Sequence, residues 1–314
     1  MKAPVRGLVG LLLLAILVAG AIALLRRGMY GLTVFMLLPV LLGGLASWVF
    51  RPATGQQAAA VGALTVMAAV WSFLILGSEG MICIMLTLPL AVPLGALGSW
   101  LVYRAEPSGA ATSSVAMLLL LPAASVTWDA KAPPPLFEVR TAMTIAAAPE
   151  QVWRHVVTFS ELPEPQEWFF RAGLAYPKRA RIDGSGPGAT RYCEFSTGSF
   201  VEPIKVWNEP HLLRFSVTHN PAPMREWSPY GHVSPKHLHG YLISKQGQFR
   251  LTRLANDRTL LEGTTWYQHG LWPAEYWRWW SDAIIHRIHL RVLTHIRTLA
   301  EKDVSAHENR HPRR

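Results

Sequence analysis

The chain has 314 residues, of which 50% are hydrophobic and only 16% charged, and its formal net charge is +10. Residues 1–128 hold few of these charges, whereas every later part of the chain is ordinarily polar. Each Lys, Arg or Asp at a bilayer centre costs about 2.5–3.5 kcal/mol, so a long segment that avoids charge belongs in lipid. The composition therefore excludes a wholly water-soluble protein. No basic stripe carries a recognition motif, and no nucleic-acid partner is expected.

The charge-poor segment contains five apolar runs, each near the length that spans a bilayer. They cover residues 7–25, 29–50, 58–77, 81–103 and 111–128. The fourth contains Pro89 and Pro93, which predict a kink, and the fifth is the shortest and contains Pro122. Since the runs hold essentially no ionisable residue, they predict an anchor rather than a transport pathway. We expect a multi-pass protein of a bacterial-type plasma membrane.

The side on which the C-terminal part lies depends on the fifth run. With five spans, Lys2, Arg6, Arg51 and Arg104 share one side, and Arg26 and Arg27 lie on the other. Positive residues favour the cytoplasmic side, so the N-terminus would be cytoplasmic and the C-terminal domain would be outside the cytoplasm. If residues 111–128 do not span, the domain is cytoplasmic. The charge distribution favours the first arrangement.

The remaining residues divide into a Pro-rich linker (129–135), a domain (136–303) and a polar tail (304–314). Residues 136–146 alternate between apolar and polar, which predicts a strand, and Pro149 opens a helix. A short helical segment (161–173) follows, and then strands at 190–196, 199–207, 212–218, 248–254 and 259–268. The long irregular stretch 220–247 is typical of a lid or binding loop. Apolar residues at spacings of three and four predict one long helix over 273–302.

Several sequence segments in this order resemble the START-like (SRPBCC) superfamily, which includes polyketide cyclase/dehydrase-like proteins. They are residues 143–153 (MTIAAAPEQVW), 186–191 (GPGATR), 202–207 (EPIKVW), 213–217 (LRFSV) and 261–266 (LEGTTW). The resemblance covers about residues 136–303. It implies an α+β helix-grip fold, in which a curved antiparallel sheet wraps around a long C-terminal helix and an apolar pocket lies between the sheet and the helix. This domain would follow an all-α transmembrane bundle.

The pocket that the resemblance implies is the first candidate site, and the expected ligand is a hydrophobic small molecule or lipid. Large aromatic side chains suit such a ligand. The predicted ligand-binding residues are Phe195, Trp207, Phe215, Trp227, Tyr241, Phe249, Trp266, Trp280 and His286. Membrane-tethered ligand binding is the favoured function. A cyclase- or dehydratase-like enzyme acting on a polyketide-like substrate in the same pocket is the alternative, and no catalytic residue is assigned.

Metal and acid–base chemistry have weaker signals. His237 and His239 alternate on a possible strand and could share a face, but the spacing fixes no third ligand. Neither a metal nor another cofactor is therefore predicted. Glu202 and Glu262 would be useful acids or bases only if they faced the pocket. Of the two cysteines, Cys83 lies in an apolar run, so Cys193 cannot form a disulfide within the domain.

Overall fold

The computed structural model describes residues 3–105, 125 and 134–310. The chain divides into two compact units. The helical unit comprises Met1–Pro134 together with two later segments, Arg225–His239 and Gly270–Glu275. The helix-grip unit is formed by Pro135–Met224, Gly240–His269 and Tyr276–Arg314. Two segments that the sequence assigns to the soluble domain thus pack with the N-terminal helices.

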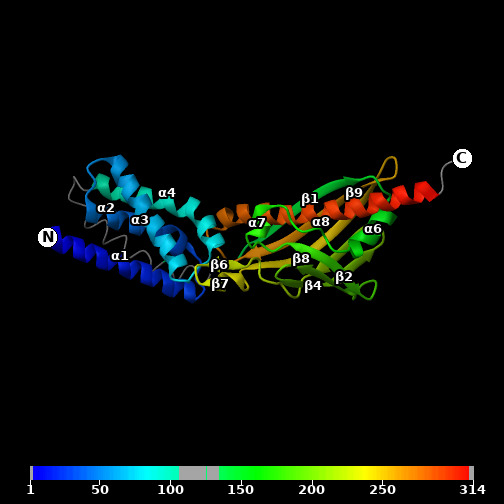
Figure 1. Cartoon of the computed structure of the whole chain (residues 1–314), viewed down its shortest axis with the longest axis horizontal. Coiled ribbons are helices and arrows are strands. Elements are labelled where there is room, and N and C mark those ends of the chain that lie inside the picture. The colour runs from blue at the N-terminus through cyan, green and yellow to red at the C-terminus, as the bar shows by residue number, and fades with distance from the viewer. Residues whose placement is uncertain (1–2, 106–124, 126–133, 311–314) are drawn as a thin grey trace. The chain divides into compact units, whose positions relative to one another are not determined.

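The helical unit is built from long apolar helices. They are α1 (Ala3–Arg26), the π-helical turn η1 (Thr33–Leu37) leading into α2 (Leu38–Phe50), α3 (Gly55–Ile75) and α4 (Met81–Ala105). Four stretches, Val5–Arg26, Thr33–Phe50, Gly55–Ile75 and Met81–Ala105, are long and apolar enough to cross a membrane. They correspond to the first four predicted spans (Figure 1). The predicted fifth span, 111–128, lies outside the described residues apart from Ser125.

Glycines allow α2, α3 and α4 to pack backbone against backbone. A Cβ atom added to Gly43 would lie 1.9 Å from the carbonyl oxygen of Gly95, and one added to Gly62 would lie 2.2 Å from the same oxygen. Small residues of this kind are how helices approach closely in lipid, where apolar burial alone does not favour association. The bundle core therefore tolerates no larger side chain at these positions.

The two ends of the helical unit carry different contacts. At one end, the Arg6 guanidinium donates to the carbonyl of Trp48, so the start of α1 lies beside the end of α2. At the other end, the N–H of Trp272 donates to the carbonyl of Tyr30 (3.1 Å). The Arg225–His239 segment also packs at this second end, where its Glu226 carboxylate accepts hydrogen bonds from the first turn of α4.

The Arg225–His239 segment is a small folded insertion rather than an irregular loop. It contains the hairpin β6 (Glu226–Ser228) and β7 (Gly231–Val233) and the 3-10 turn η3 (Lys236–Leu238). The expectation that residues 220–247 are one long irregular stretch is corrected by this arrangement. The pattern rich in Pro, Gly and His predicted irregular structure, but the residues that bury this segment lie in the N-terminal helices, far away in sequence.

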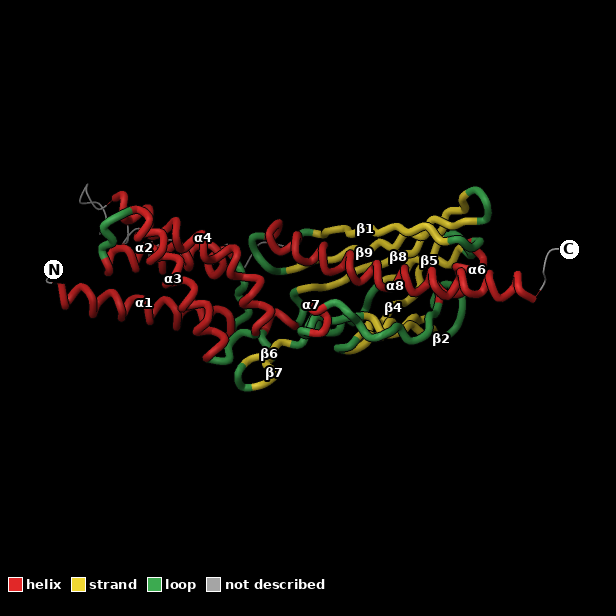
Figure 2. Tube along the Cα trace, turned by 45° about the horizontal axis from the view of Figure 1, so that its top comes forward, coloured by secondary structure: helices red, strands yellow, loops and turns green. Residues whose placement is uncertain are grey.

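The helix-grip unit contains a seven-stranded sheet with the order β1-β9-β8-β5-β4-β3-β2, in which every neighbouring pair is antiparallel. The strands are β1 (Leu136–Ile145), β2 (Pro177–Asp183), β3 (Thr190–Phe195), β4 (Gly198–Asn208), β5 (Leu212–Ser216), β8 (Leu242–Leu254) and β9 (Arg258–His269). The helices are α6 (Pro149–Val157), α7 (Trp168–Arg171) and α8 (Ala274–Arg310). In Figure 2, α8 runs along one face of the curved sheet. The predicted helix-grip fold is confirmed.

Local chemistry accounts for most of these elements. Pro149 opens α6, where its missing N–H costs no hydrogen bond. Asn256 and Asp257 turn the β8–β9 hairpin with positive φ angles of 58° and 49°. Strand β2 was not predicted, because four of the seven side chains in PKRARID are charged; of the others, Pro177 and Ala180 are buried and Ile182 is partly buried.

The core of the helix-grip unit lies between the sheet and the C-terminal half of α8. Leu213 and Leu261 from the sheet are fully buried against Leu293 and Ile296 from the helix. At about 25 cal/mol per Å² of apolar surface removed from water, such side chains contribute on the order of 2 kcal/mol each. We call the side of the sheet that carries this core the inner face.

Candidate functional site

Strand register places four of the predicted ligand-binding residues on the inner face. Phe249 and Trp207 each pair with Leu213, and Phe215 lies two residues along the same strand. Phe195 follows Arg191 and Cys193 with the two-residue alternation of β3. Phe215 is buried, whereas Phe195, Trp207 and Phe249 are only partly buried although they pack against the core. The inner face therefore presents aromatic surface that the core does not fully cover.

Trp207 makes the firmest contact of this group. Its ring meets Trp153 of α6 edge to face, with centroids 5.6 Å apart, and its indole nitrogen donates to Glu209 (3.4 Å). Phe195 similarly meets Phe200 of β4 edge to face at 4.8 Å. Edge-to-face pairs of this kind add about 0.5–1.5 kcal/mol beyond area burial. Both rings are thus held in fixed orientations.

A buried ion pair lies among these aromatic rings. Arg191 of β3, 2% exposed, donates to the carboxylate of Glu202 on β4, and its Nε donates to the carbonyl of Val157 (3.2 Å). The guanidinium carbon is 5.5–5.6 Å from the ring centroids of Phe159, Phe215 and Phe249. Paired and hydrogen-bonded in this way, the two charges can be buried without a large penalty. Glu202 faces the interior, which its predicted use as an acid or base required, but its charge is already neutralised by Arg191.

A polar group lies where α8 crosses β1 and β9. The Thr141 hydroxyl is 2.8 Å from Nδ1 of His286 and 3.1 Å from Nδ1 of His289, and His289 Nε2 is 2.8 Å from the Thr265 hydroxyl. Burial lowers the pKa of His289 to about 4, with a smaller contribution from His286. His289 is therefore neutral at pH 7 and can accept a proton. One helical turn earlier, the Tyr267 hydroxyl donates to Asp282 (2.5 Å).

Other predicted positions are placed elsewhere. Trp227 lies on β6 in the helical unit and is 49% exposed. Trp266 points away from α8, because its indole donates to the exposed Glu138 (2.9 Å) on the outer face. Glu262 shares that outer face and pairs with Arg140 at 3.3 Å. Strand alternation explains both, since Thr265 and Tyr267 take the inward positions on either side of Trp266.

Three more predicted residues are Tyr241, Trp280 and His286, of which the first two are partly buried. Tyr241 precedes β8 and is partly buried, and that burial raises its pKa. Trp280 is partly buried on α8, where its ring meets Trp279 at a centroid distance of 4.6 Å. His286 is on the same helix and is exposed, although it contacts Thr141. These three stay predictions as ligand contacts.

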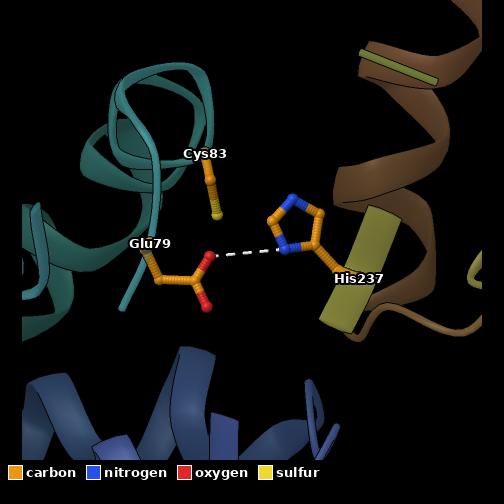
Figure 3. A group of neighbouring side chains, drawn as sticks. All are labelled: Glu79, Cys83 and His237. Carbon is orange, nitrogen blue, oxygen red and sulfur yellow. Dashed lines mark ion pairs between the residues drawn. The ribbon is translucent and has the colours of Figure 1, made fainter. Parts of the chain in front are cut away.

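A second candidate site, which the sequence did not indicate, lies in the helical unit. Glu79, Cys83 and His237 bring a carboxylate, a thiol and an imidazole within 4.8 Å of one another (Figure 3). His237 is 7% exposed, whereas His239 is exposed and bonds to Ser234 (2.9 Å). The expectation that the two histidines share a face is therefore corrected. That expectation assumed a strand, but Lys236–Leu238 form the 3-10 turn η3, so the two side chains do not alternate as they would in a strand.

Comparison with known proteins gives matches in fold only. No family model matches the chain, and no curated protein matches it in sequence. Norcoclaurine synthase from Thalictrum flavum, in complex with dopamine and hydroxybenzaldehyde, is 12% identical over 54% of this chain and 88% of its own, with a TM-score of 0.36. A Streptomyces aromatase/cyclase is 16% identical over 54% and 96%, with a TM-score of 0.34.

The Aha1 dimer from Colwellia psychrerythraea is 14% identical over 41% of this chain and 75% of its own, with a TM-score of 0.25. The helix-grip assignment rests on the strand order and on the position of α8 along the inner face, both described above. These likenesses concern the fold alone.

Proposed function

We propose that the protein is a membrane-anchored helix-grip module that binds a hydrophobic small molecule or lipid on the inner face of its sheet. The observation that carries this proposal is the part-exposed aromatic surface formed by Phe195, Phe200 and Phe249 beside the core. Rigid aromatic rings offer a large apolar contact area at low entropic cost. Four apolar helices would hold the module at the membrane, from which such ligands partition.

The buried Arg191–Glu202 pair adds a requirement on the ligand. Its charges are already satisfied by each other and by the carbonyl of Val157, so they leave little demand for a charged ligand group. The hydroxyl and imidazole groups at Thr141, Thr265 and His289 are better placed to hydrogen-bond a neutral polar group. A mainly apolar molecule with one neutral oxygen function fits this arrangement.

Native mass spectrometry on detergent-purified full-length protein, followed by solvent extraction, tests ligand binding. Phe249→Ala should reduce the bound fraction by removing inner-face contact area. Trp266→Ala is the matched control, since it removes an aromatic side chain from the outer face of the same sheet. Equal ligand loss in both variants, or wild-type protein that carries no apolar compound, would contradict the proposal.

The convergence of two imidazoles on one hydroxyl favours a second candidate, an enzyme of the cyclase or dehydratase kind. His286 and His289 both lie within hydrogen-bond distance of Thr141, and a neutral His289 could serve as a general base. His289→Gln should then cause a chemically different compound, the unreacted substrate, to copurify. If wild-type and variant carry the same compound, simple binding is the better account.

We further propose that the helix-grip unit lies outside the cytoplasm. Counting the ends of the four helices alone, Arg6, Arg51 and Arg104 lie at one end and Arg26 and Arg27 at the other, and the larger basic count favours the cytoplasm. Arg225–His239 packs at the opposite end, beside Tyr30 and the start of α4. Reporter fusions to the two termini should therefore give signals from opposite sides of the membrane. Signals from the same side would contradict this orientation.

A further inference from the structure

The Glu79, Cys83 and His237 side chains come from three different parts of the helical unit. Glu79 lies in the turn between α3 and α4, Cys83 lies in the first turn of α4, and His237 lies in η3 of the Arg225–His239 segment. Figure 3 shows the carboxylate, thiol and imidazole pointing toward a common centre. Nδ1 of His237 is already 3.3 Å from Oε2 of Glu79. No two of the three donor atoms are more than 4.8 Å apart.

This spacing suits a tetrahedral metal ion. Zinc–ligand bonds of about 2.0–2.3 Å place neighbouring ligand atoms roughly 3.5 Å apart. The Glu79–His237 separation already matches that value, and the other pairs, at up to 4.8 Å, need to close by at most about 1.3 Å. Carboxylate, thiolate and imidazole together form a mixed set of borderline character that favours Zn²⁺ over Ca²⁺ or Mg²⁺, which prefer oxygen alone.

Each donor also has a second polar group beside it, and for Glu79 this is a hydrogen bond. The Tyr30 hydroxyl donates to Oε1 of Glu79 (2.8 Å), which leaves Oε2 for the centre of the cluster. Nε2 of His237 lies 3.9 Å from the Glu226 carboxylate, so the ring can ligate through Nδ1 while its other nitrogen faces an acceptor. Cys83 Sγ lies 4.0 Å from the Thr87 hydroxyl. A carboxylate behind a ligating histidine is a common feature of zinc sites.

The balance of buried charges also supports a bound cation. Glu79 and Glu226 are 2% and 0% exposed, and His237 is the only basic side chain within ion-pair distance of either among the described residues. Oε2 of Glu79 is buried and receives no hydrogen bond of good geometry from the part of the chain that is described. Glu226 is stabilised by the N–H groups of Ile82 (3.0 Å) and Cys83 (2.8 Å). Glu79 is therefore the carboxylate that needs a cation.

We propose that Glu79, Cys83 and His237 bind one Zn²⁺ ion and that this ion fastens the Arg225–His239 segment to the start of α4. A small cavity of about 30 Å³ adjoins the cluster, with Tyr30, Glu79 and Cys83 in its wall. The volume is large enough for one water molecule, which the ion itself would hold as its fourth ligand. The ion balances the charges of the Glu79 carboxylate and the Cys83 thiolate.

The decisive measurement uses wild-type full-length protein in detergent, so that no variant has to fold for the test to succeed. Purified protein is supplied with Zn²⁺, dialysed against metal-free buffer and analysed by elemental mass spectrometry. One Zn²⁺ per chain is expected. Replacement by Co²⁺ should give the visible bands of a tetrahedral site together with a thiolate-to-cobalt charge-transfer band. Absence of stoichiometric metal, or Co²⁺ bound without the charge-transfer band, overturns the proposal.

Variants then assign the ligands. Cys83→Ser should abolish the charge-transfer band, whereas Cys193→Ser, which alters the only other cysteine, should leave it intact. His237→Gln should weaken Zn²⁺ binding strongly, and His239→Gln in the same segment should not. Glu226→Gln acts behind the ligand and should weaken binding about ten- to a hundred-fold. Equal effects of His237→Gln and His239→Gln contradict the assignment.

Discussion

Glu202→Gln removes the negative partner of Arg191 and leaves a guanidinium that is 2% exposed without a counter-ion. Breaking a buried ion pair from one side typically costs about 3–5 kcal/mol, because the remaining charge stays desolvated. The aromatic rings of Phe215 and Phe249 lie 5.5 and 5.6 Å from the guanidinium and offset only part of this loss. The helix-grip unit should therefore open at a much lower denaturant concentration.

Cys193 provides the probe for this measurement on the full-length protein. It lies two residues from Arg191 on the same face of β3, is 6% exposed, and burial raises the pKa of its thiol to about 12. It should react with an alkylating reagent only when the unit opens. Pulse alkylation at increasing urea concentration, read by peptide mass spectrometry, separates Cys193 from Cys83. With a slope of about 1–3 kcal/mol per molar urea, Glu202→Gln should lower the midpoint by more than about 1 M.

The double variant Arg191→Met, Glu202→Leu decides whether the charge or the packing matters. Replacing both partners by apolar side chains removes the unpaired charge, and such replacements are often neutral or stabilising. Its midpoint should therefore return close to that of wild type. If the double variant is as unstable as Glu202→Gln alone, or if Glu202→Gln leaves the midpoint unchanged, the account of a desolvated guanidinium is refuted.

Two further predictions concern stability. Burial holds the pKa of His289 near 4 in the folded protein, whereas an unfolded histidine has a pKa of about 6.5. Between pH 6.5 and 4, therefore, only the unfolded chain binds a proton at His289. The contribution of His289 to the free energy of unfolding is fully present above pH 6.5 and falls by about 3 kcal/mol toward pH 4. Urea midpoints at Cys193 should show a weaker pH dependence in His289→Gln, and equal slopes would contradict the assignment. Gly62→Leu should disrupt the helical unit, because a Cβ there meets the Gly95 oxygen at 2.2 Å, whereas Gly20→Leu has open space. Thermal aggregation in detergent compares the two, and equal transition temperatures would contradict this packing.

Hydrophobic periodicity was enough to predict the two halves of the chain. Four charge-poor runs correspond to helices of membrane-spanning length, and alternation along residues 136–146 gives β1 almost residue by residue. These patterns are local, so the sequence alone carries them. Face assignments within strands were less secure. Trp266 was expected in the pocket because it is aromatic, but the alternation of β9 places it on the outer face, between the inward-facing Thr265 and Tyr267.

The Glu79–Cys83–His237 cluster could not be predicted in the same way. His237 is more than 150 residues from Glu79, and it reaches the helices only because Arg225–His239 leaves the helix-grip unit to pack elsewhere. No spacing rule connects residues brought together by such an insertion. One signal was present in the sequence: Glu79 is one of only two acidic residues before Trp128, and it lies between two apolar runs. An isolated carboxylate in that position favours a functional role.

The last prediction concerns how firmly the Arg225–His239 segment is held by contacts with the buried carboxylates of Glu79 and Glu226. The Glu226 carboxylate is fully buried and accepts hydrogen bonds from two α4 amides, so the segment packs there only while that charge is compensated. His237→Gln removes an imidazole from between Glu79 and Glu226 and should loosen the segment. Trypsin should then cleave faster after Arg225, and His239→Gln serves as the control. Added chelator should accelerate cleavage of the wild-type protein if Zn²⁺ fastens the segment. Cleavage that is equally slow in both variants would mean that the β6–β7 hairpin is held by other contacts and that the cluster does not anchor it.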